Sequence, residues 1–416
     1  MTTQGDWTRI GMLAFVATLA LGGTAGAQSW TSGPSLPEGR AYLAAGTIGP
    51  VVYATGGVGP TGVTSTVFAL DTSAASPAWV AAPAMSTPRY THGAAVASNL
   101  LYVMGGHDAS GQNLASAEVF DPTANGGAGA WQPIADMPDW RIDFGAAAVG
   151  GIVYAVGGST SAQFSSSTVL AFDPASGLWS PRRSMNQGRS NHAVVALGRF
   201  IYAIGGGTDS VERYDPVADA WTFVAPLPSG SNANGHLGAG VGGGKILAVG
   251  GYNGGYLTAV FAYDPALDAW SPTASLATPR TNQADATVGE ALYTIGGSTT
   301  GDGATPTVEI YSAPPPPDPL PTALAAIAAL PPSAVTTAGN QQALHNFLQQ
   351  AMAALAAQPP NNAIATQKLQ LALSRTDGCA LRGAPDGNGP GMDWITDCGA
   401  QAQIYPLLLA ALAAIP

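Results

Sequence analysis

Short apolar runs that end at a pair of glycines recur six times along this 416-residue chain. The runs read VVYAT, LYVM, IVYAV, IYAI, ILAV and LYTI, and successive glycine pairs lie 45 to 52 residues apart. Apolar runs of this length, bounded by turn residues, are typical of short buried strands. The regular period indicates that the chain folds as a series of equivalent supersecondary units.

Other residues hold fixed positions around each glycine pair. Four repeats continue with an aromatic–Asp–Pro turn and then a tryptophan. Five repeats have an arginine sixteen residues before the glycine pair: Arg40, Arg89, Arg141, Arg189 and Arg280. This combination resembles the kelch repeat over about residues 28 to 312. The resemblance implies a β-propeller in which each repeat supplies a four-stranded blade.

The two ends of the repeat region predict how the ring of blades closes. The sixth repeat ends at Tyr311 and Ser312 without its tryptophan, whereas an unassigned Trp30 precedes Arg40 by the usual ten residues. We therefore expect residues 29–32 to complete the last blade, which removes an exposed sheet edge. The predicted fold is an all-β six-bladed propeller over residues 28–312, followed by a small all-α C-terminal domain.

Antiparallel strand order predicts that the five arginines gather at one face of the disc. The connections between blades, which contain the arginines, emerge at the same end as the loops after the glycine pairs. His92 and His192 follow an arginine by three residues, so they either line a pocket at this face or bond within the strand entry. Small residues in the innermost strands suit a narrow central channel.

An arginine-lined face suggests recognition of an anionic glycan, peptide or surface partner, because guanidinium groups bind carboxylates and sulfates in a bidentate manner. The alternative is that each arginine braces a neighbouring blade through loop carbonyls or an acidic side chain. The resemblance also implies two other functions. One is that of the periplasmic kelch sialic-acid mutarotases, and the other is that of a structural or adhesive surface module.

Composition excludes several other function classes. The net charge of −11 argues against generic binding of nucleic acid or anionic membranes. The repeat region contains no cysteine, which rules out the thioether-linked copper site of galactose-oxidase-like propellers. No HExxH motif or clustered Cys and His spacing suggests a zinc enzyme. We expect a non-catalytic protein without a cofactor, apart from the calcium considered below.

Residues 1–27 have the pattern of a bacterial Sec-type signal peptide. Arg9 precedes an uncharged apolar run over residues 10–21, and Ala25, Gly26 and Ala27 form a small-residue cleavage site. The run is short for a bilayer-spanning helix. We therefore predict cleavage after Ala27 and a periplasmic or secreted protein.

The composition changes after the repeats. Residues 313–321 form a proline-rich linker, and residues 322–416 are rich in alanine and leucine. Helical spacing of apolar residues predicts helices over 322–330, 341–357, 361–374 and 401–414, the last interrupted at Pro406. We expect this segment to be a separate helical domain.

The two cysteines of the chain bracket a glycine-rich loop in this domain. In an exported protein Cys379 and Cys398 are expected to form a disulfide, with a reactive thiol pair as the alternative. The enclosed Asp386, Asn388, Asp393 and Asp397 partly match a calcium-binding loop, but Pro390 replaces one ligand. The other interpretation of this loop is a rigid turn closed by the disulfide.

Overall fold

The computed structural model describes residues 29–228, 235–300, 303–312, 319–357, 360–376, 393–413 and 415. The predicted signal peptide, Cys379, Asp386 and Asn388 lie outside these ranges, so the export signal and the disulfide stay predictions. Within the described part of the chain, no helix is both long and apolar enough to span a bilayer.

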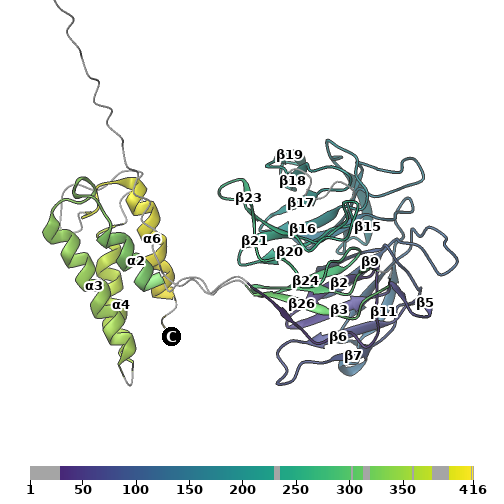
Figure 1. Ribbon diagram of the computed structural model, residues 1–416, viewed down its shortest axis with the longest axis horizontal. Coiled ribbons are helices and arrows are strands. Elements are labelled where there is room, and N and C mark those ends of the chain that lie inside the picture. Colours follow the sequence, from purple (N-terminus) through teal and green to yellow (C-terminus); the bar gives the residue numbers. More distant parts are fainter. Residues whose placement is uncertain are drawn as a thin grey trace, which may run out of the picture.

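Six four-stranded antiparallel sheets form the blades of a propeller, as predicted (Figure 1). The innermost strands of successive blades contact one another, and the sixth contacts the first, so the blades close a ring. From the innermost strand outward the first three blades are β2 (Ala44–Ile48), β3 (Val51–Thr55), β6 (Val67–Asp71) and β7 (Trp79–Ala82); β8 (Gly93–Ala97), β9 (Leu100–Met104), β10 (Ala117–Asp121) and β11 (Ala130–Ile134); and β12 (Gly145–Val149), β13 (Ile152–Val156), β14 (Val169–Asp173) and β15 (Leu178–Arg182).

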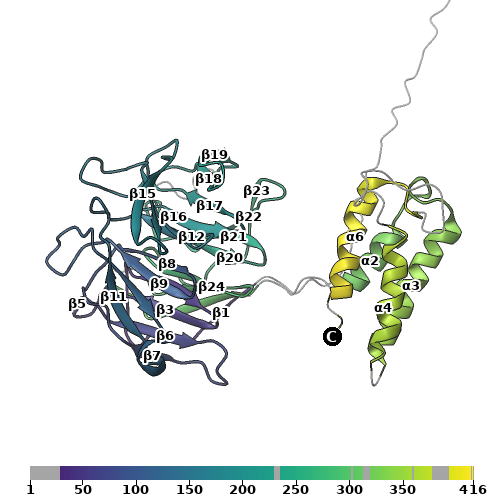
Figure 2. The same cartoon turned by 180° about the vertical axis from the view of Figure 1, so that it is seen from behind.

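The other three blades have the same layout (Figure 2). They are β16 (Ala193–Leu197), β17 (Phe200–Ile204), β18 (Val211–Asp215) and β19 (Ala220–Val224); β20 (Gly238–Gly242), β21 (Lys245–Val249), β22 (Val260–Asp264) and β23 (Ala269–Pro272); and β24 (Ala284–Val288), β25 (Ala291–Ile295), β26 (Val308–Ser312) and β1 (Ser29–Ser32). A small hairpin of β4 (Val58–Gly59) and β5 (Gly62–Val63) decorates the first blade, and a short turn labelled α1 (Ala124–Gly127) joins β10 to β11.

Each sheet is covered on both faces by its neighbours, which explains why the second strand of each blade is a continuous apolar run. Aromatic side chains fill the space between blades, as expected from the repeat. Tyr53 of the first blade lies 5.3 Å from Phe120 of the second, measured between ring centroids. The indole N–H of Trp131 donates to the carbonyl of Pro83, which follows the outer strand of the preceding blade.

The N-terminal strand closes the ring, which confirms the expectation from Trp30. Strand β1 pairs antiparallel with β26 and places Trp30 opposite Tyr311. The Trp30 indole N–H donates to the carbonyl of Ala274 in the fifth blade at 2.8 Å. The closing strand is therefore held both by its own sheet and by the neighbouring blade.

The C-terminal unit is helical and has its own apolar core. Its described elements are α2 (Pro319–Ala328), η1 (Pro332–Ala334), α3 (Ala338–Ala356), α4 (Asn362–Leu373) and α6 (Cys398–Ala413). Thr337 and Asn361 cap the N-termini of α3 and α4 with their side chains. Helix α2 begins at Pro319, so the last three residues of the predicted linker are helical rather than extended.

We predict that Trp30→Ala destabilises the propeller by about 3 kcal/mol or more, because it removes the indole that packs on Tyr311 and bonds to the fifth blade. Chemical denaturation should show the loss as a lower midpoint. Val80→Ala, at an outer-strand residue that is 59% exposed, is the control and should change little. Equal midpoints for the two variants would contradict the closure described above.

Candidate functional site

The five repeat arginines lie inside the blades and not on an open face. Their side chains are between 0 and 2% exposed. The residue that follows an arginine pairs, in several repeats, with a residue in the loop after the glycine pair; Tyr90 with His107 is an example. The connections between blades and the loops after the glycine pairs therefore meet at one end of the disc, as predicted. Burial nevertheless keeps Arg40, Arg89, Arg141, Arg189 and Arg280 from binding a ligand directly, and it favours the bracing alternative.

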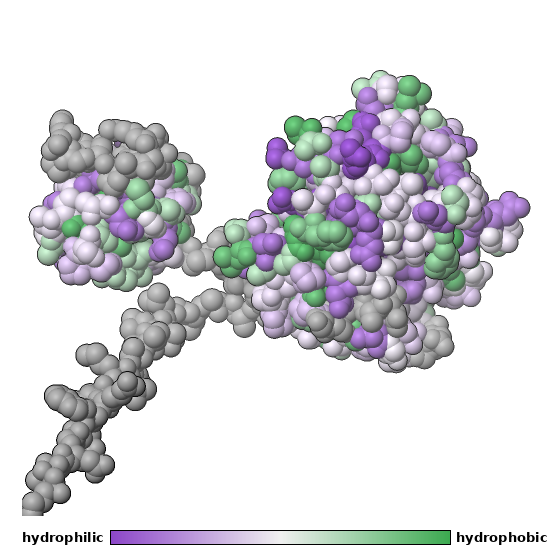
Figure 3. All heavy atoms as spheres, turned by 90° about the horizontal axis from the view of Figure 1, so that it is seen from above, coloured by the Kyte–Doolittle hydropathy of each residue, from purple (hydrophilic) through white to green (hydrophobic). Residues whose placement is uncertain are grey.

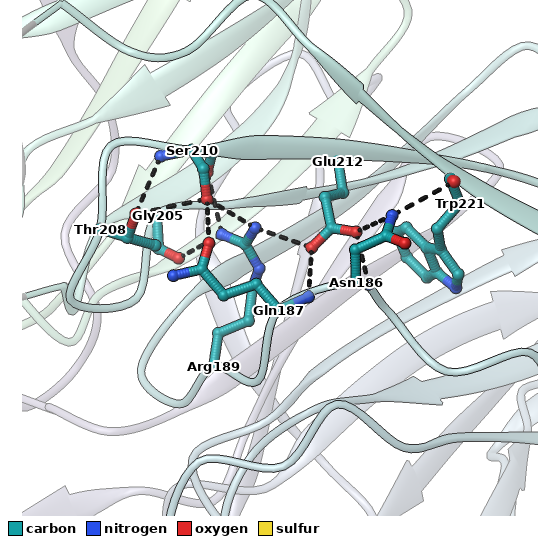
Figure 4. Close-up of polar contacts among 8 residues, drawn as sticks. All are labelled: Asn186, Gln187, Arg189, Gly205, Thr208, Ser210, Glu212 and Trp221. Atoms are coloured by element: carbon teal, nitrogen blue, oxygen red, sulfur yellow. Dashed lines mark hydrogen bonds and ion pairs between the residues drawn. The ribbon is translucent and has the colours of Figure 1, made fainter.

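Both Nη atoms of each guanidinium are engaged in bonds within the protein, as Figure 4 shows for Arg189, whereas Nε is buried without a partner in the part of the chain that the structure describes. Its Nη1 donates to the carbonyl of Gly205, the first glycine of the pair, at 2.7 Å, and to the carbonyl of Ser210 at 2.9 Å. Its Nη2 donates to the Ser210 hydroxyl at 2.8 Å and to the Glu212 carboxylate at 3.0 Å. Both Nη atoms are therefore unavailable to a ligand.

The backbone of each arginine links its blade to the preceding one. The N–H of the second glycine of a pair donates to the carbonyl of the arginine in the following blade, for example Gly158 to Arg189 at 2.8 Å. A Cβ on the first glycine of that pair, Gly157, would lie 2.9 Å from the same carbonyl, and its φ of 64° is left-handed. Only glycine fits both demands without strain.

Sequence reasoning missed the acidic partners of these arginines. Glu118, Glu212 and Glu309 are buried and pair with Arg89, Arg189 and Arg280 at 3.0, 3.0 and 2.6 Å. The three glutamates occupy the same register position in the third strand of their blades. A Ser or Thr two residues before each glutamate was the available signal.

A second set of repeated residues forms a hydrogen-bonded ring at the end of the channel. Each ring residue donates its backbone N–H to the carbonyl of the ring residue in the preceding blade at 2.7 to 3.3 Å, and the sixth bond closes the circle. All six have a left-handed φ between 52° and 58° although none is glycine. The ring residues are Tyr42, Thr91, Asp143, Asn191, His236 and Asn282.

The ring residues line a cavity of about 110 Å³ that we call the channel mouth. The residue after each ring residue also lines it, so all six blades contribute. His92 and His192 belong to this second layer, and whether they bind a ligand stays a prediction. Both are nearly buried, and the His92 ring nitrogen Nε2 lies 2.9 Å from the Thr55 hydroxyl.

Burial keeps both second-layer histidines neutral. It lowers the pKa of His92 well below the ordinary value, with Arg89 as a second cause. It lowers the pKa of His192 to about 3, again with a contribution from neighbouring arginines. At neutral pH neither ring contributes a positive charge to the channel mouth.

The ring side chains are mostly polar, and Asp143 carries the one carboxyl group among them. Burial raises the pKa of the Asp143 carboxyl, while His236 and His107 lower it by a smaller amount. Tyr42 also lines the cavity; its ring lies 6.2 Å from that of Tyr90, which stacks on His107 at 4.9 Å. The mouth thus combines one carboxyl group with the aromatic side chains of Tyr42 and Phe144.

The predicted calcium loop is only partly described. The Asp397 carboxylate accepts the backbone N–H of Ala400 at 2.8 Å and thereby caps helix α6, and Asp393 is buried. Among the described residues, no group of three or more His, Cys, Asp or Glu side chains is placed to hold a metal ion. Asp386 and Asn388 lie outside those residues, so calcium binding stays a prediction.

Comparisons with known proteins agree with the repeat pattern. A family model of the KLHDC2/KLHL20/DRC7 Kelch-repeats domain matches residues 42–227, and the Kelch motif matches residues 234–277. Mouse Kelch-like protein 35 is 28% identical over 242 residues, which are 57% of this chain and 40% of that protein. Alpha-scruin of Limulus polyphemus is 31% identical over 150 residues, which are 33% of this chain and 16% of that protein.

The chain thus spans well under half the length of these curated relatives. Among solved structures, one titled "Structure of YjhT" superposes with a TM-score of 0.57 at 20% identity. The alignment covers 66% of this chain and 95% of that one. At this identity the likeness shows the fold alone.

We predict that Arg189→Ala lowers the free energy of unfolding by about 3–5 kcal/mol, because it leaves the Glu212 carboxylate buried without its partner. Arg199→Ala is the matched control, since Arg199 pairs with Asp215 at 2.8 Å while 60% exposed and should cost below about 1 kcal/mol. Denaturant titrations of both variants measure the difference. If Arg189→Ala proved as mild as the control, the buried arginines would not be structural.

Proposed function

Because this chain is a kelch-repeat protein, we propose that its propeller binds a partner protein at the channel mouth. The observation on which the proposal depends is the cavity itself, which is lined by two residues from each of the six blades. The Nη atoms of the repeat arginines, which brace the blades, are engaged in internal bonds. The polar side chains of the backbone-bonded ring instead line this cavity on a rigid base, which is what a recognition site needs.

The size of the cavity favours the end of a protein side chain as its occupant. A buried cavity of about 150 Å³ holds one benzene molecule. The mouth is smaller than that, at about 110 Å³, so the part of a ligand that enters it comprises only a few non-hydrogen atoms. A partner segment would insert one side chain and lie across the surrounding loops.

The charges around the mouth do not favour the anionic ligand expected from the sequence. Four repeat arginines are neutralised by carboxylates at 2.6 to 3.0 Å. The described connections at this face then hold more acids than remaining arginines: Asp108, Asp136, Asp139, Asp143 and Asp209 against Arg141 and Arg183. We therefore propose a neutral or basic protein segment, met after export if the signal peptide is cleaved as predicted.

A mutarotase is the second candidate because one carboxyl has a suitable pKa. Burial raises the pKa of Asp285 to about 7, which suits general acid–base catalysis near neutral pH. Its Oδ2 atom, however, packs against Gly238, where an added Cβ would lie 1.6 Å away. Asp285 does not line the channel mouth, so this arrangement favours binding over catalysis.

We expect no catalysis of sugar anomerisation. The exchange of sialic acid anomers followed by NMR should proceed at the same rate with and without catalytic amounts of the protein. An accelerated rate that Asp285→Asn abolishes would replace the binding proposal with the mutarotase.

We predict that Asn191→Trp blocks partner binding, because an indole at this ring position fills the channel mouth. Asn125→Trp is a matched control: Asn125 has the same φ of 53° but lies in the turn between β10 and β11. Proteins captured from the cell surface or growth medium by the tagged wild type should be retained by the control and lost from Asn191→Trp. Capture of the same proteins by both variants would place the partner elsewhere.

A further inference from the structure

Asp143 carries the one carboxyl group among the residues that line the channel mouth. It is half-buried, and it makes no side-chain hydrogen bond or ion pair within the described part of the chain. The contrast with the rest of the propeller is sharp, because Glu118, Glu212 and Glu309 each have an arginine. A carboxylate withdrawn from water without a partner is unfavourable, and an entering cation would relieve that cost.

The backbone ring fixes where this carboxylate stands. The N–H of Asp143 donates to the carbonyl of Thr91 at 3.2 Å, and its own carbonyl accepts the N–H of Asn191 at 2.9 Å. Its φ of 53° is left-handed, and aspartate is among the non-glycine residues that tolerate this region best. A partner would therefore find the carboxylate already positioned.

The aromatic ring of Tyr42 lines the same cavity as the carboxylate and contacts two further rings. Tyr90 immediately precedes Thr91, which is bonded to Asp143, and the rings of Tyr42, Tyr90 and His107 form a continuous series of contacts. All three side chains are half-buried, so part of each is open to solvent. A carboxylate beside aromatic faces suits an ammonium or guanidinium group, which gains an ion pair and cation–π attraction together.

Figure 3 shows a face of the propeller on which hydrophilic and hydrophobic residues are mixed, with most of the surface of intermediate hydropathy. The channel mouth is more specific because it combines a cavity, a carboxyl group without an ion pair among the described residues and the aromatic ring of Tyr42. This combination selects for charge and shape at once.

We propose that the channel mouth binds the end of a lysine or arginine side chain of the partner protein, with Asp143 as its counter-ion and Tyr42 along its stem. This inference rests on the proposed function and names the chemistry of the partner. The size of the cavity agrees with it, because an ammonium or guanidinium group with its last methylenes comprises only a few non-hydrogen atoms.

Small probes test the site without knowledge of the partner. Nα-acetyl-lysine methylamide and Nα-acetyl-arginine methylamide are titrated into the full chain at low ionic strength, with Nα-acetyl-norleucine methylamide as the uncharged analogue. Chemical shift changes in NMR spectra report binding. At least one cationic probe should bind more tightly than the norleucine probe, and Asp143→Asn should weaken that binding about ten- to hundredfold.

Asp136→Asn is the charge-matched control. Asp136 is exposed in the loop that leads to Arg141, so its replacement removes the same formal charge from the same face. It should leave the affinity within about twofold, because an exposed charge is screened by water and salt. Equal losses in Asp143→Asn and Asp136→Asn would reduce the effect to general electrostatics and overturn the site.

Acidification gives an independent readout. As pH falls, Asp143 becomes neutral, so affinity for the cationic probe should fall, and burial, which raises the pKa of this carboxyl, moves the loss to higher pH than for an exposed aspartate. The norleucine probe should show no such trend. Cation binding that persists in Asp143→Asn, or that increases at low pH, contradicts the inference.

The two proposals fail in different ways. If Asn191→Trp abolishes capture of the partner while Asp143→Asn leaves it unchanged, the mouth is the docking site but the cation is not what it recognises. If neither variant affects capture yet the cationic probes bind, the site exists and the partner docks elsewhere.

Discussion

The buried arginine that joins two glycine pairs is the interaction on which the propeller depends. Its side chain satisfies the carbonyl of one pair in its own blade, and its backbone carbonyl satisfies the N–H of the pair in the blade before. Left-handed glycines turn these groups inward, where an unsatisfied backbone group costs as much as a lost hydrogen bond. Because the same residue serves two blades, it fixes both the end of each second strand and the angle between neighbours. This double role explains why sixteen residues always separate the arginine from the glycine pair of its own blade.

Much of the fold could be predicted because its determinants are local and repeated. The apolar runs, the aromatic–Asp–Pro turns and the tryptophans indicated blades, and the displaced Trp30 indicated the closing strand. The role of the arginines was harder to predict, because burial depends on residues in the third strand. Leu170 of the third blade occupies the position of Glu118, and Arg141 accordingly lacks a carboxylate and has its pKa lowered to about 10 by burial. The fifth repeat, which has Asn234 instead of arginine, has Phe261 at that position.

The candidate site escaped prediction for a different reason. Ring positions share a backbone conformation and a closed circle of N–H to carbonyl bonds, but their side chains share no chemistry. A search for sequence repeats detects recurring residue types. It therefore finds the repeat arginines and overlooks the ring positions, where the residue differs from one repeat to the next. Such positions are the ones free to specialise, because the backbone holds the geometry and the side chain is not needed for it. Three of the six ring positions hold aspartate or asparagine, because these residues tolerate the left-handed conformation better than most others.

The braces also determine the electrostatics of the mouth. Most arginines of the repeats are paired with carboxylates inside the blades, where each pair is close to neutral for a group outside. The face therefore presents mainly its loop aspartates, although the repeat pattern contains arginines. Among those aspartates, Asp108 and Asp139 bond to nearby hydroxyl and amide groups, which holds them in their own loops. Asp143 has no such bond, and the backbone ring fixes it at the channel mouth. Because most of the repeat arginines are paired internally, the Asp143 carboxylate determines which charge a ligand group at the channel mouth must carry.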